Sequence, residues 1–242
     1  MRPLPYFIQS SLLRSIPGVH HAFPGVDPVE GRGAKERLAE VFAVSSGTIG
    51  TLRQIHSGIV LQLEPGDTGT PDAGSREGDA LWTETPGMGL GVRTADCVPV
   101  LIAHRRIPLV AAVHAGWRGL VSGIVWETIR ALEERIGKEE VSGLVAAAGP
   151  CARACCYEVD EETADALVSV SDTALRKGEK PGKWFVDLQA AALSALTAAG
   201  VPFSCSEGIG PCTICSPLFY SFRREKKQAA RQLSFICIHR TY

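Results

Sequence analysis

The stretch that decides the fold is VPVLIAHRRIPLVAAV, residues 98–113. It contains two apolar runs, 98–103 and 109–113, with a short polar connection at 104–108 between them. Apolar runs of this length, bounded by turn residues, are typical of strands buried on both faces. We therefore expect an antiparallel hairpin within a sheet.

The hairpin predicts which side chains meet at its open end. In an antiparallel pair the centre of the turn fixes the partner of every residue. A turn centred on Arg105 and Arg106 places Cys97 opposite His114, with Cβ atoms about 5 Å apart. The sequence therefore predicts a thiol beside an imidazole, followed by a tight turn at 115–119.

Two kinds of functional site fit this Cys97–His114 pair. An imidazole stabilises a thiolate, so the pair can be an activated nucleophile. Cysteine and histidine can also supply ligands to a catalytic zinc, which takes three protein ligands and leaves one position open. His56, in QIHSG at 54–58, is the best candidate for the third ligand. The structural alternative is a small buried Cys97 and a hydrogen-bonded core His114.

Other segments place this hairpin in an α+β protein. Short strands are expected at 59–63, 80–83 and 233–238, and helices at 121–136, 161–170 and 188–199. Strands in pairs with helices interspersed irregularly favour α+β over a regular βαβ winding. No internal repeat or linker divides the chain, so we expect a single domain over residues 1–242.

Composition excludes several classes of function. The chain has 242 residues, 45% hydrophobic and 21% charged, with 25 Lys and Arg against 26 Asp and Glu. This balance makes no overall electrostatic case for binding nucleic acid or an anionic membrane. The longest uncharged run, 188–206, is interrupted by polar residues and a Gly-Val-Pro break, and no signal peptide is visible. We expect a cytoplasmic protein.

The eight cysteines are expected to be reduced, because the chain carries no secretion signal. Cys212 and Cys215 form a CxxC pair. The segment Pro211-Cys212-Thr213-Ile214-Cys215 and the segment Cys205-Ser206-Glu207 resemble the two halves of the zinc deaminase signature. Only three residues separate these halves, so we regard the match as chance. With no second CxxC, structural thiols are the preferred interpretation. Cys151, Cys155 and Cys156 have no assigned role.

A basic cluster lies near the C-terminus, beside Phe219 and Tyr220. It is either a solvated helix face, which composition favours, or an anion site suited to phosphate. Its members are Arg223, Arg224, Lys226, Lys227 and Arg231.

A series of motifs makes the chain similar to a known family. In order, the motifs are QxHxG at 54–58, GDAL at 78–81, ADCxP at 95–99, HAGWRG at 114–119, GP at 149–150, CYEV at 156–159, DL at 187–188, CT at 212–213 and FYSFRR at 219–224. Over about residues 54–238 the chain resembles the laccase-domain family, also called the polyphenol oxidase or peptidoglycan editing factor family. Residues 1–50 are least like it.

The resemblance implies a fold, a metal and an activity. The fold would be one α+β domain of stacked mixed β-sheets flanked by helices. The metal would be zinc, bound by His56, Cys97 and His114 as catalytic residues. The activity would be phosphorolysis of adenosine, inosine and methylthioadenosine, with adenosine deamination as a side activity. Arg118, Tyr220, Arg223 and Arg224 are candidates for contacts with substrate or phosphate.

The sequence departs from the family after its first histidine motif. Members usually carry a Thr-Arg segment followed by glycines there, whereas His21-Ala22-Phe23 is followed here by Pro24-Gly25-Val26-Asp27. A contact made by that family arginine must be supplied otherwise.

Three alternatives stay open. The family name suggests a copper-dependent polyphenol oxidase, but six histidines are too few for a multicopper cluster, and only Met1 and Met88 could be a blue-copper axial ligand. A Cys97–His114 hydrolase could edit peptidoglycan precursors. A non-catalytic metal- or redox-sensing protein would depend on the thiol clusters instead.

Overall fold

Two β-sheets packed face to face form the centre of the computed structural model, which describes residues 6–26, 33–64, 66–67 and 76–239. The five-stranded sheet has the order β1 (Phe7–Ile8), β2 (Val19–Pro24), β14 (Gln232–Ile238), β6 (Gly89–Thr94), β3 (Ile49–Gly50). The six-stranded sheet has the order β13 (Ser206–Gly208), β9 (Leu144–Ala148), β7 (Val98–His104), β8 (Val110–Ala115), β5 (Ala80–Thr83), β4 (Val60–Gln62). Each sheet mixes parallel and antiparallel pairs.

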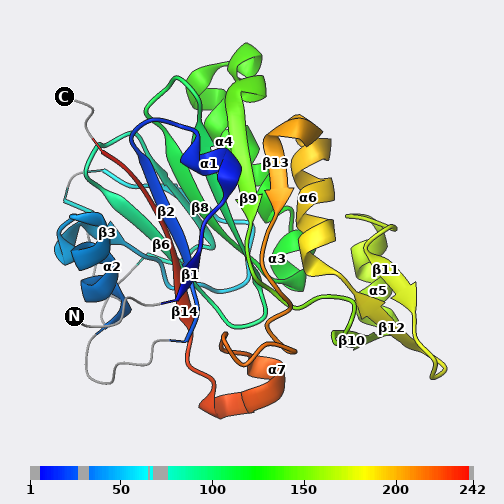
Figure 1. Cartoon of the computed structure of the whole chain (residues 1–242). Helices are drawn as coiled ribbons and strands as arrows, with labels where there is room; N and C mark the ends of the chain where they lie inside the picture. The colour runs from blue at the N-terminus through cyan, green and yellow to red at the C-terminus, as the bar shows by residue number, and fades with distance from the viewer. Residues whose placement is uncertain (1–5, 27–32, 65, 68–75, 240–242) are drawn as a thin grey trace.

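Helices cover the outer faces of both sheets (Figure 1). On the five-stranded sheet lies α2 (Ala34–Phe42), and on the six-stranded sheet lie α3 (Trp117–Val121), α4 (Ile124–Ile136) and α6 (Leu188–Ala198). A small sheet at one end has the order β10 (Glu158–Asp160), β12 (Lys183–Val186), β11 (Leu175–Lys177), with α5 (Glu161–Val168) against it. The remaining helices are α1 (Ser11–Arg14) and α7 (Phe222–Glu225), with 3₁₀ turns at 46–48, 138–143, 203–205 and 226–228. The α+β expectation is confirmed.

Strand β7 is buried on both faces, which explains why its sequence is apolar without interruption. Val98, Val100 and Ile102 pack into the core cluster beneath the helices. Leu101 and Ala103 pack into the second cluster, between the two sheets. A strand covered on both faces has no solvent side on which polar residues would alternate.

The expected hairpin is present, but the predicted register differs from the observed one by two residues. Val98 lies opposite Ala115 and Pro99 opposite His114, so the turn is centred one residue later than predicted. The cause is His104, which continues β7: its N–H donates to Leu109 O, and its Nδ1 accepts from the N–H groups of Arg106 and Ile107. A shift of two preserves the face on which side chains lie, so Cys97 and His114 still approach each other.

Most other expected elements are confirmed within two residues at their ends. The exception is the helix expected at 121–136. The observed helix, α4, begins only at Ile124, because the chain turns at Gly123, where φ is +75°. A separate short helix, α3, precedes this turn and takes the place of the tight turn expected at 115–119. Glycine adopts this backbone conformation readily, and it lets the chain change direction between α3 and α4.

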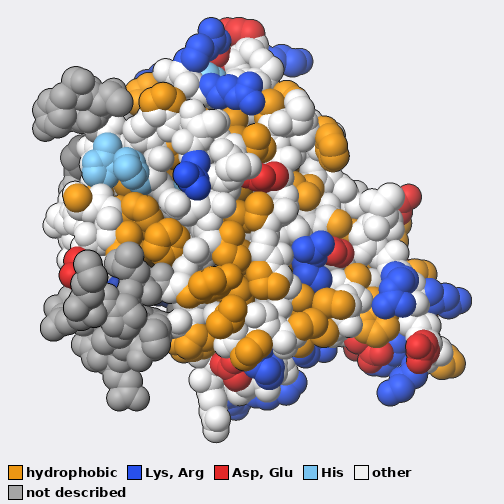
Figure 2. Space-filling model, viewed as in Figure 1, with side chains coloured by type: hydrophobic (Ala, Val, Ile, Leu, Met, Phe, Trp, Pro, Cys, Tyr) orange, Lys and Arg blue, Asp and Glu red, His pale blue; other side chains and the backbone are white. Residues whose placement is uncertain are grey.

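The surface drawn in Figure 2 carries charges of both signs. Lys and Arg side chains lie beside Asp and Glu over the small sheet, where Lys183 pairs with Asp160. Among the described residues, no helix has the length and apolar character needed to cross a membrane.

Candidate active site

Asp79 fixes the loop that carries His56. The backbone N–H groups of Ile55, His56 and Ser57 all donate to its carboxylate, and so does Ser57 Oγ at 2.7 Å. His56 has φ +62°, a conformation that is uncommon outside glycine and is held here by these bonds. The imidazole of His56 is therefore presented from a fixed loop.

The same carboxylate orients His114, at the end of β8. His114 Nδ1 lies 2.8 Å from Asp79 Oδ1, and both side chains are buried. Burial lowers the pKa of His114, but hydrogen bonds with Asp79 and Cys97 outweigh burial and raise it to about 9. Burial raises the pKa of Asp79, but the bonds from His114 and Ser57 hold it well below its usual range. Because Asp79 occupies Nδ1, Nε2 of His114 is the nitrogen available for a ligand.

Cys97 lies where the chain passes from the five-stranded sheet (β6) to the six-stranded sheet (β7). Its Sγ is 3.9 Å from His56 Nε2. Burial raises the pKa of this thiol, but hydrogen bonds with His114 and His56 lower it to about 6. A side chain at Gly116 would collide with the sulfur, since an added Cβ would lie 2.7 Å from it. The Cys97 thiol is therefore poised as a thiolate in a space that glycine keeps open.

These three side chains fit a metal ion. Their ligand atoms lie within 4.8 Å of one another, and the rings of His56 and His114 meet edge to face. Two imidazoles and one thiolate suit zinc, and a carboxylate behind a ligating histidine is the usual supporting arrangement. His56 is exposed. The trio thus forms a possible metal site that faces solvent on one side.

A cavity of about 720 Å³ opens at the trio. This volume is in the range of small-molecule sites. Five cationic side chains line it against one carboxylate, that of Asp96, so it is strongly positive. The cations are Arg93, Arg118, Arg223, Lys226 and Arg231.

Aromatic rings accompany these cations. The guanidinium of Arg118 lies 4.4 Å from the ring of Trp117, and that of Arg223 lies 4.9 Å from the ring of Tyr157. Phe222 lies at 5.7 Å from Arg231. Aromatic faces stack on planar bases, and arginine forks bind oxyanions. The cavity is suited to a ligand with both parts.

The structure brings some of the expected substrate contacts to the cavity and not others. Arg118 and Arg223 line it. Arg224 and Tyr220 are not among the lining residues. The Arg224 guanidinium instead donates to the carbonyl oxygens of a loop, at Thr213, Ile214, Ser216 and Phe219. Tyr220 lines a second, smaller pocket.

Sequence reasoning missed two carboxylates. Asp79 stood in the GDAL motif without an assigned role, although it orients two members of the trio. Asp96 accepts from Thr213 Oγ1 at 2.7 Å and from the N–H of Arg223 at 2.6 Å. Its φ of +87° is strained for a residue with a side chain. The position of Asp96 directly before Cys97 in the sequence was the signal that could have revealed its role.

Comparisons with known proteins show the family to which this chain belongs. Residues 26–239 match the sequence model of the family described as multi-copper polyphenol oxidoreductase laccase. A purine nucleoside phosphorylase of Aquifex aeolicus is 38% identical over 167 residues, which cover 69% of this chain and 74% of that protein. The purine nucleoside phosphorylase YlmD of Geobacillus stearothermophilus is 32% identical over 233 residues, covering 90% of this chain and 81% of that protein.

Solved structures share the architecture. The crystal structure of YlmD from Geobacillus stearothermophilus has a TM-score of 0.87 at 27% identity, over 98% of this chain and 100% of that one. The protein YfiH of Bacillus licheniformis has a TM-score of 0.82 at 25% identity, over 91% and 92% of the two chains.

Proposed function

This chain belongs to the multi-copper polyphenol oxidoreductase laccase family, and we propose that it is a zinc-dependent purine nucleoside phosphorylase. Its substrates are adenosine, inosine and methylthioadenosine together with phosphate. The whole chain acts as a single domain. All eight cysteines are free, which is in keeping with a cytoplasmic enzyme.

The observation that carries the proposal is the positive cavity beside the trio. Phosphorolysis requires phosphate, an oxyanion, to be held next to the sugar of a nucleoside, while the planar, uncharged base of that nucleoside is held beside it. Arg118 and Arg223 supply forks for the oxyanion, and Trp117 and Tyr157 supply surfaces for the base. Relatives named purine nucleoside phosphorylase support the same substrate class.

The reaction exchanges one bond at the sugar for another. An oxygen of phosphate bonds to C1′, the bond from C1′ to the purine nitrogen breaks, and its electron pair leaves with the base, which takes up a proton. The side chains bind and orient: Arg223 holds phosphate, Tyr157 excludes water from one side of the base, and Asp79 keeps the proton of His114 on Nδ1. Zinc, held by His56, Cys97 and His114, would supply a Lewis acid and a site for an activated water.

Three protein ligands would leave one coordination position of zinc open for water. For this reason we extend the proposal to adenosine deamination as a side activity. Deamination requires a water that attacks the purine ring in place of phosphate at the sugar. The bond from C6 to the exocyclic nitrogen would break as the oxygen of water bonds to C6, so adenosine and water would yield inosine and ammonia without phosphate.

Zinc is preferred to copper because the methionine that usually serves as the axial ligand of a blue-copper site is absent from the described residues that line the cavity. Met88 is buried in the core between the sheets, where its sulfur accepts from Thr83 Oγ1, and it does not line the cavity. Met1 lies outside the described residues. Without a methionine near the trio, a copper oxidase is the weaker hypothesis.

Arg231 is the candidate to replace the missing family arginine. It lines the main cavity and also the smaller pocket, whose wall includes Pro24 and Gly25, where the family pattern is interrupted. Asp27, the last residue of that departure, lies outside the described residues.

Product analysis tests the proposal. The zinc-loaded protein is incubated with inosine, with and without phosphate, and hypoxanthine and ribose 1-phosphate are quantified, with the Cys97→Ser variant as the blank. Phosphate-dependent release of both products supports phosphorolysis, and inosine formation from adenosine supports the side activity. Full activity of metal-free protein on amide bonds of peptidoglycan precursors would instead favour the Cys–His hydrolase.

A further inference from the structure

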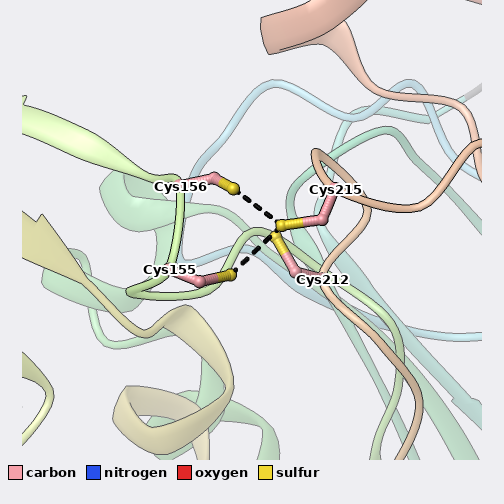
Figure 3. Close-up of side chains that lie close together, drawn as sticks. All are labelled: Cys155, Cys156, Cys212 and Cys215. Atoms are coloured by element: carbon pink, nitrogen blue, oxygen red, sulfur yellow. Dashed lines mark hydrogen bonds between the residues drawn. The ribbon is translucent and has the colours of Figure 1, made fainter.

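Four cysteines outside the active site meet between two loops. Cys155 and Cys156 lie in the loop that joins β9 to β10, and Cys212 and Cys215 lie in the loop that follows β13. Figure 3 shows the four side chains converging from opposite sides, so that their sulfur atoms face a common centre. The sequence contained a single CxxC pair without a partner, and the fold supplies that partner as two adjacent cysteines about 60 positions away.

The separations of the sulfur atoms are close to those of a four-thiolate zinc site. All four lie within 4.8 Å of one another. A tetrahedron with zinc–sulfur bonds of about 2.3 Å has sulfur atoms roughly 3.8 Å apart. Cys215 Sγ is 3.3 Å from Cys155 Sγ and 2.7 Å from Cys156 Sγ. Side-chain rotations that move these sulfurs about 1 Å apart would make room for the ion.

Backbone pairing aligns the two loops that carry the cluster. Cys151 and Cys212 form an isolated parallel bridge, and the N–H of Thr213 donates to Cys151 O at 2.9 Å. This bridge holds the two loops side by side, so the four sulfur atoms are brought together by the fold itself.

We propose that Cys155, Cys156, Cys212 and Cys215 bind one structural zinc ion. Four S–H bonds break, four zinc–sulfur bonds form and four protons pass to solvent, so no oxidant or reductant is needed. Four-thiolate sites leave zinc no open position and serve structure rather than catalysis. None of the four cysteines lines the substrate cavity.

The zinc would join the two loops that support the active site from behind. Thr213 lies within the CxxC turn and bonds Asp96, the neighbour of Cys97. Tyr157 follows Cys156 directly and lines the cavity. The zinc therefore stabilises two of the cavity's supports without touching substrate.

Metal content by elemental analysis tests the proposal on protein purified in reductant, loaded with zinc and dialysed. Cys215→Ser should lower the zinc-to-chain ratio by one relative to wild type, and so should Cys156→Ser. Cys151→Ala, which removes a buried neighbouring thiol outside the cluster, should leave the ratio unchanged. The difference is measured whether or not the histidine-containing trio also holds an ion, because that trio is the same in all three variants.

A second measurement needs no variant. Cys155 and Cys215 are exposed, so iodoacetamide can reach both sulfur atoms when no metal holds them. Site-resolved mass spectrometry should find their alkylation about ten-fold or more slower in zinc-loaded protein than after chelation. An unchanged zinc ratio in both cluster variants, equal alkylation rates, or a disulfide between the loops in freshly reduced, zinc-loaded protein would each overturn the proposal.

Discussion

The two thiol-containing clusters of this molecule differ in what surrounds their sulfur atoms. Cys97 is flanked by two imidazoles, one of which is backed by the Asp79 carboxylate, and its pKa is lowered to about 6 even though burial acts against this. Cys155 is flanked by other thiols: burial, and then its bond with Cys215, raise its pKa to about 11. Imidazoles can stabilise a thiolate before any metal arrives, whereas a group of thiols needs the metal itself to supply the positive charge.

The clusters also differ in their access to solvent and ligand. The trio opens on the cavity, and its three ligands would leave the fourth coordination position of zinc open. The four-cysteine cluster can saturate the ion and lies apart from the cavity. The same element would then be a reactive centre in one place and a structural link in the other. Each prediction below separates these two roles.

The largest effect is expected from removing the sulfur of the trio. Cys97→Ser should lower kcat/KM for inosine about 10³-fold, because it removes a ligand and the one cysteine among the described residues that line the cavity. The zinc-to-chain ratio should fall by one, and the melting temperature should change little. Retention of more than a tenth of the activity would remove the trio from the mechanism.

An intermediate effect is expected at Asp79, which would not bind the metal itself but is hydrogen-bonded to the ligand His114. Asp79→Asn should weaken zinc binding at the trio and lower activity by about 10–100-fold, because the amide cannot hold His114 and the His56 loop as a carboxylate does. Zinc affinity is measured by competition with a chelator, and Asp160→Asn, at an exposed ion pair, serves as the control. Zinc should stay in the four-cysteine cluster; simultaneous loss of both ions would make Asp79 a general folding residue.

A smaller effect should divide the adjacent arginines Arg223 and Arg224. Arg223→Ala should raise the phosphate KM about 10-fold, the effect of losing one charged hydrogen bond. Arg224→Ala should leave that KM within two-fold but lower stability by about 1–3 kcal/mol, since four loop carbonyls lose their donor. Equal phosphate KM values in wild type and Arg223→Ala would make both arginines structural.

The smallest expected effect is a flat pH response in metal-free protein. Cys97 has a lowered pKa of about 6, so it is a neutral thiol below that pH and already a thiolate above it; its alkylation rate should change less than two-fold between pH 7 and 8. Cys155, with a raised pKa of about 11, is still a thiol in this range and should react about ten-fold faster per pH unit. A ten-fold increase at Cys97 would mean that its imidazole partners do not stabilise the anion.

The sequence predicted the proximity of Cys97 and His114 but gave no indication of the second cluster, for physical reasons. The β7–β8 hairpin is a local structure whose apolar runs are legible in the chain, so Cys97 and His114 could be placed together even with the register wrong by two. That error arose because the His104 side chain caps the turn and extends the strand, which hydropathy does not reveal.

The second cluster had no such local signal. Cys155 and Cys215 are 60 residues apart, and the bridge between Cys151 and Cys212 that aligns their loops belongs to the tertiary structure. Arg224 was misplaced for a related reason, because a basic residue in a basic run has the same appearance whether it faces a cavity or a loop. The cavity itself required the positions of six separate segments.

The attachment of all three trio residues to one sheet has a consequence for refolding. His114 lies at the end of β8, which pairs with β7 directly after Cys97, whereas His56 is carried by the loop before β4, at the edge of the same six-stranded sheet. The β7–β8 hairpin is a local pairing, but β4 joins it only through β5, which requires longer loops to close and is therefore a slower step. In the presence of zinc, protection of Cys97 from alkylation, followed in time after dilution from denaturant, should therefore report the completion of this sheet, after helical signals have recovered.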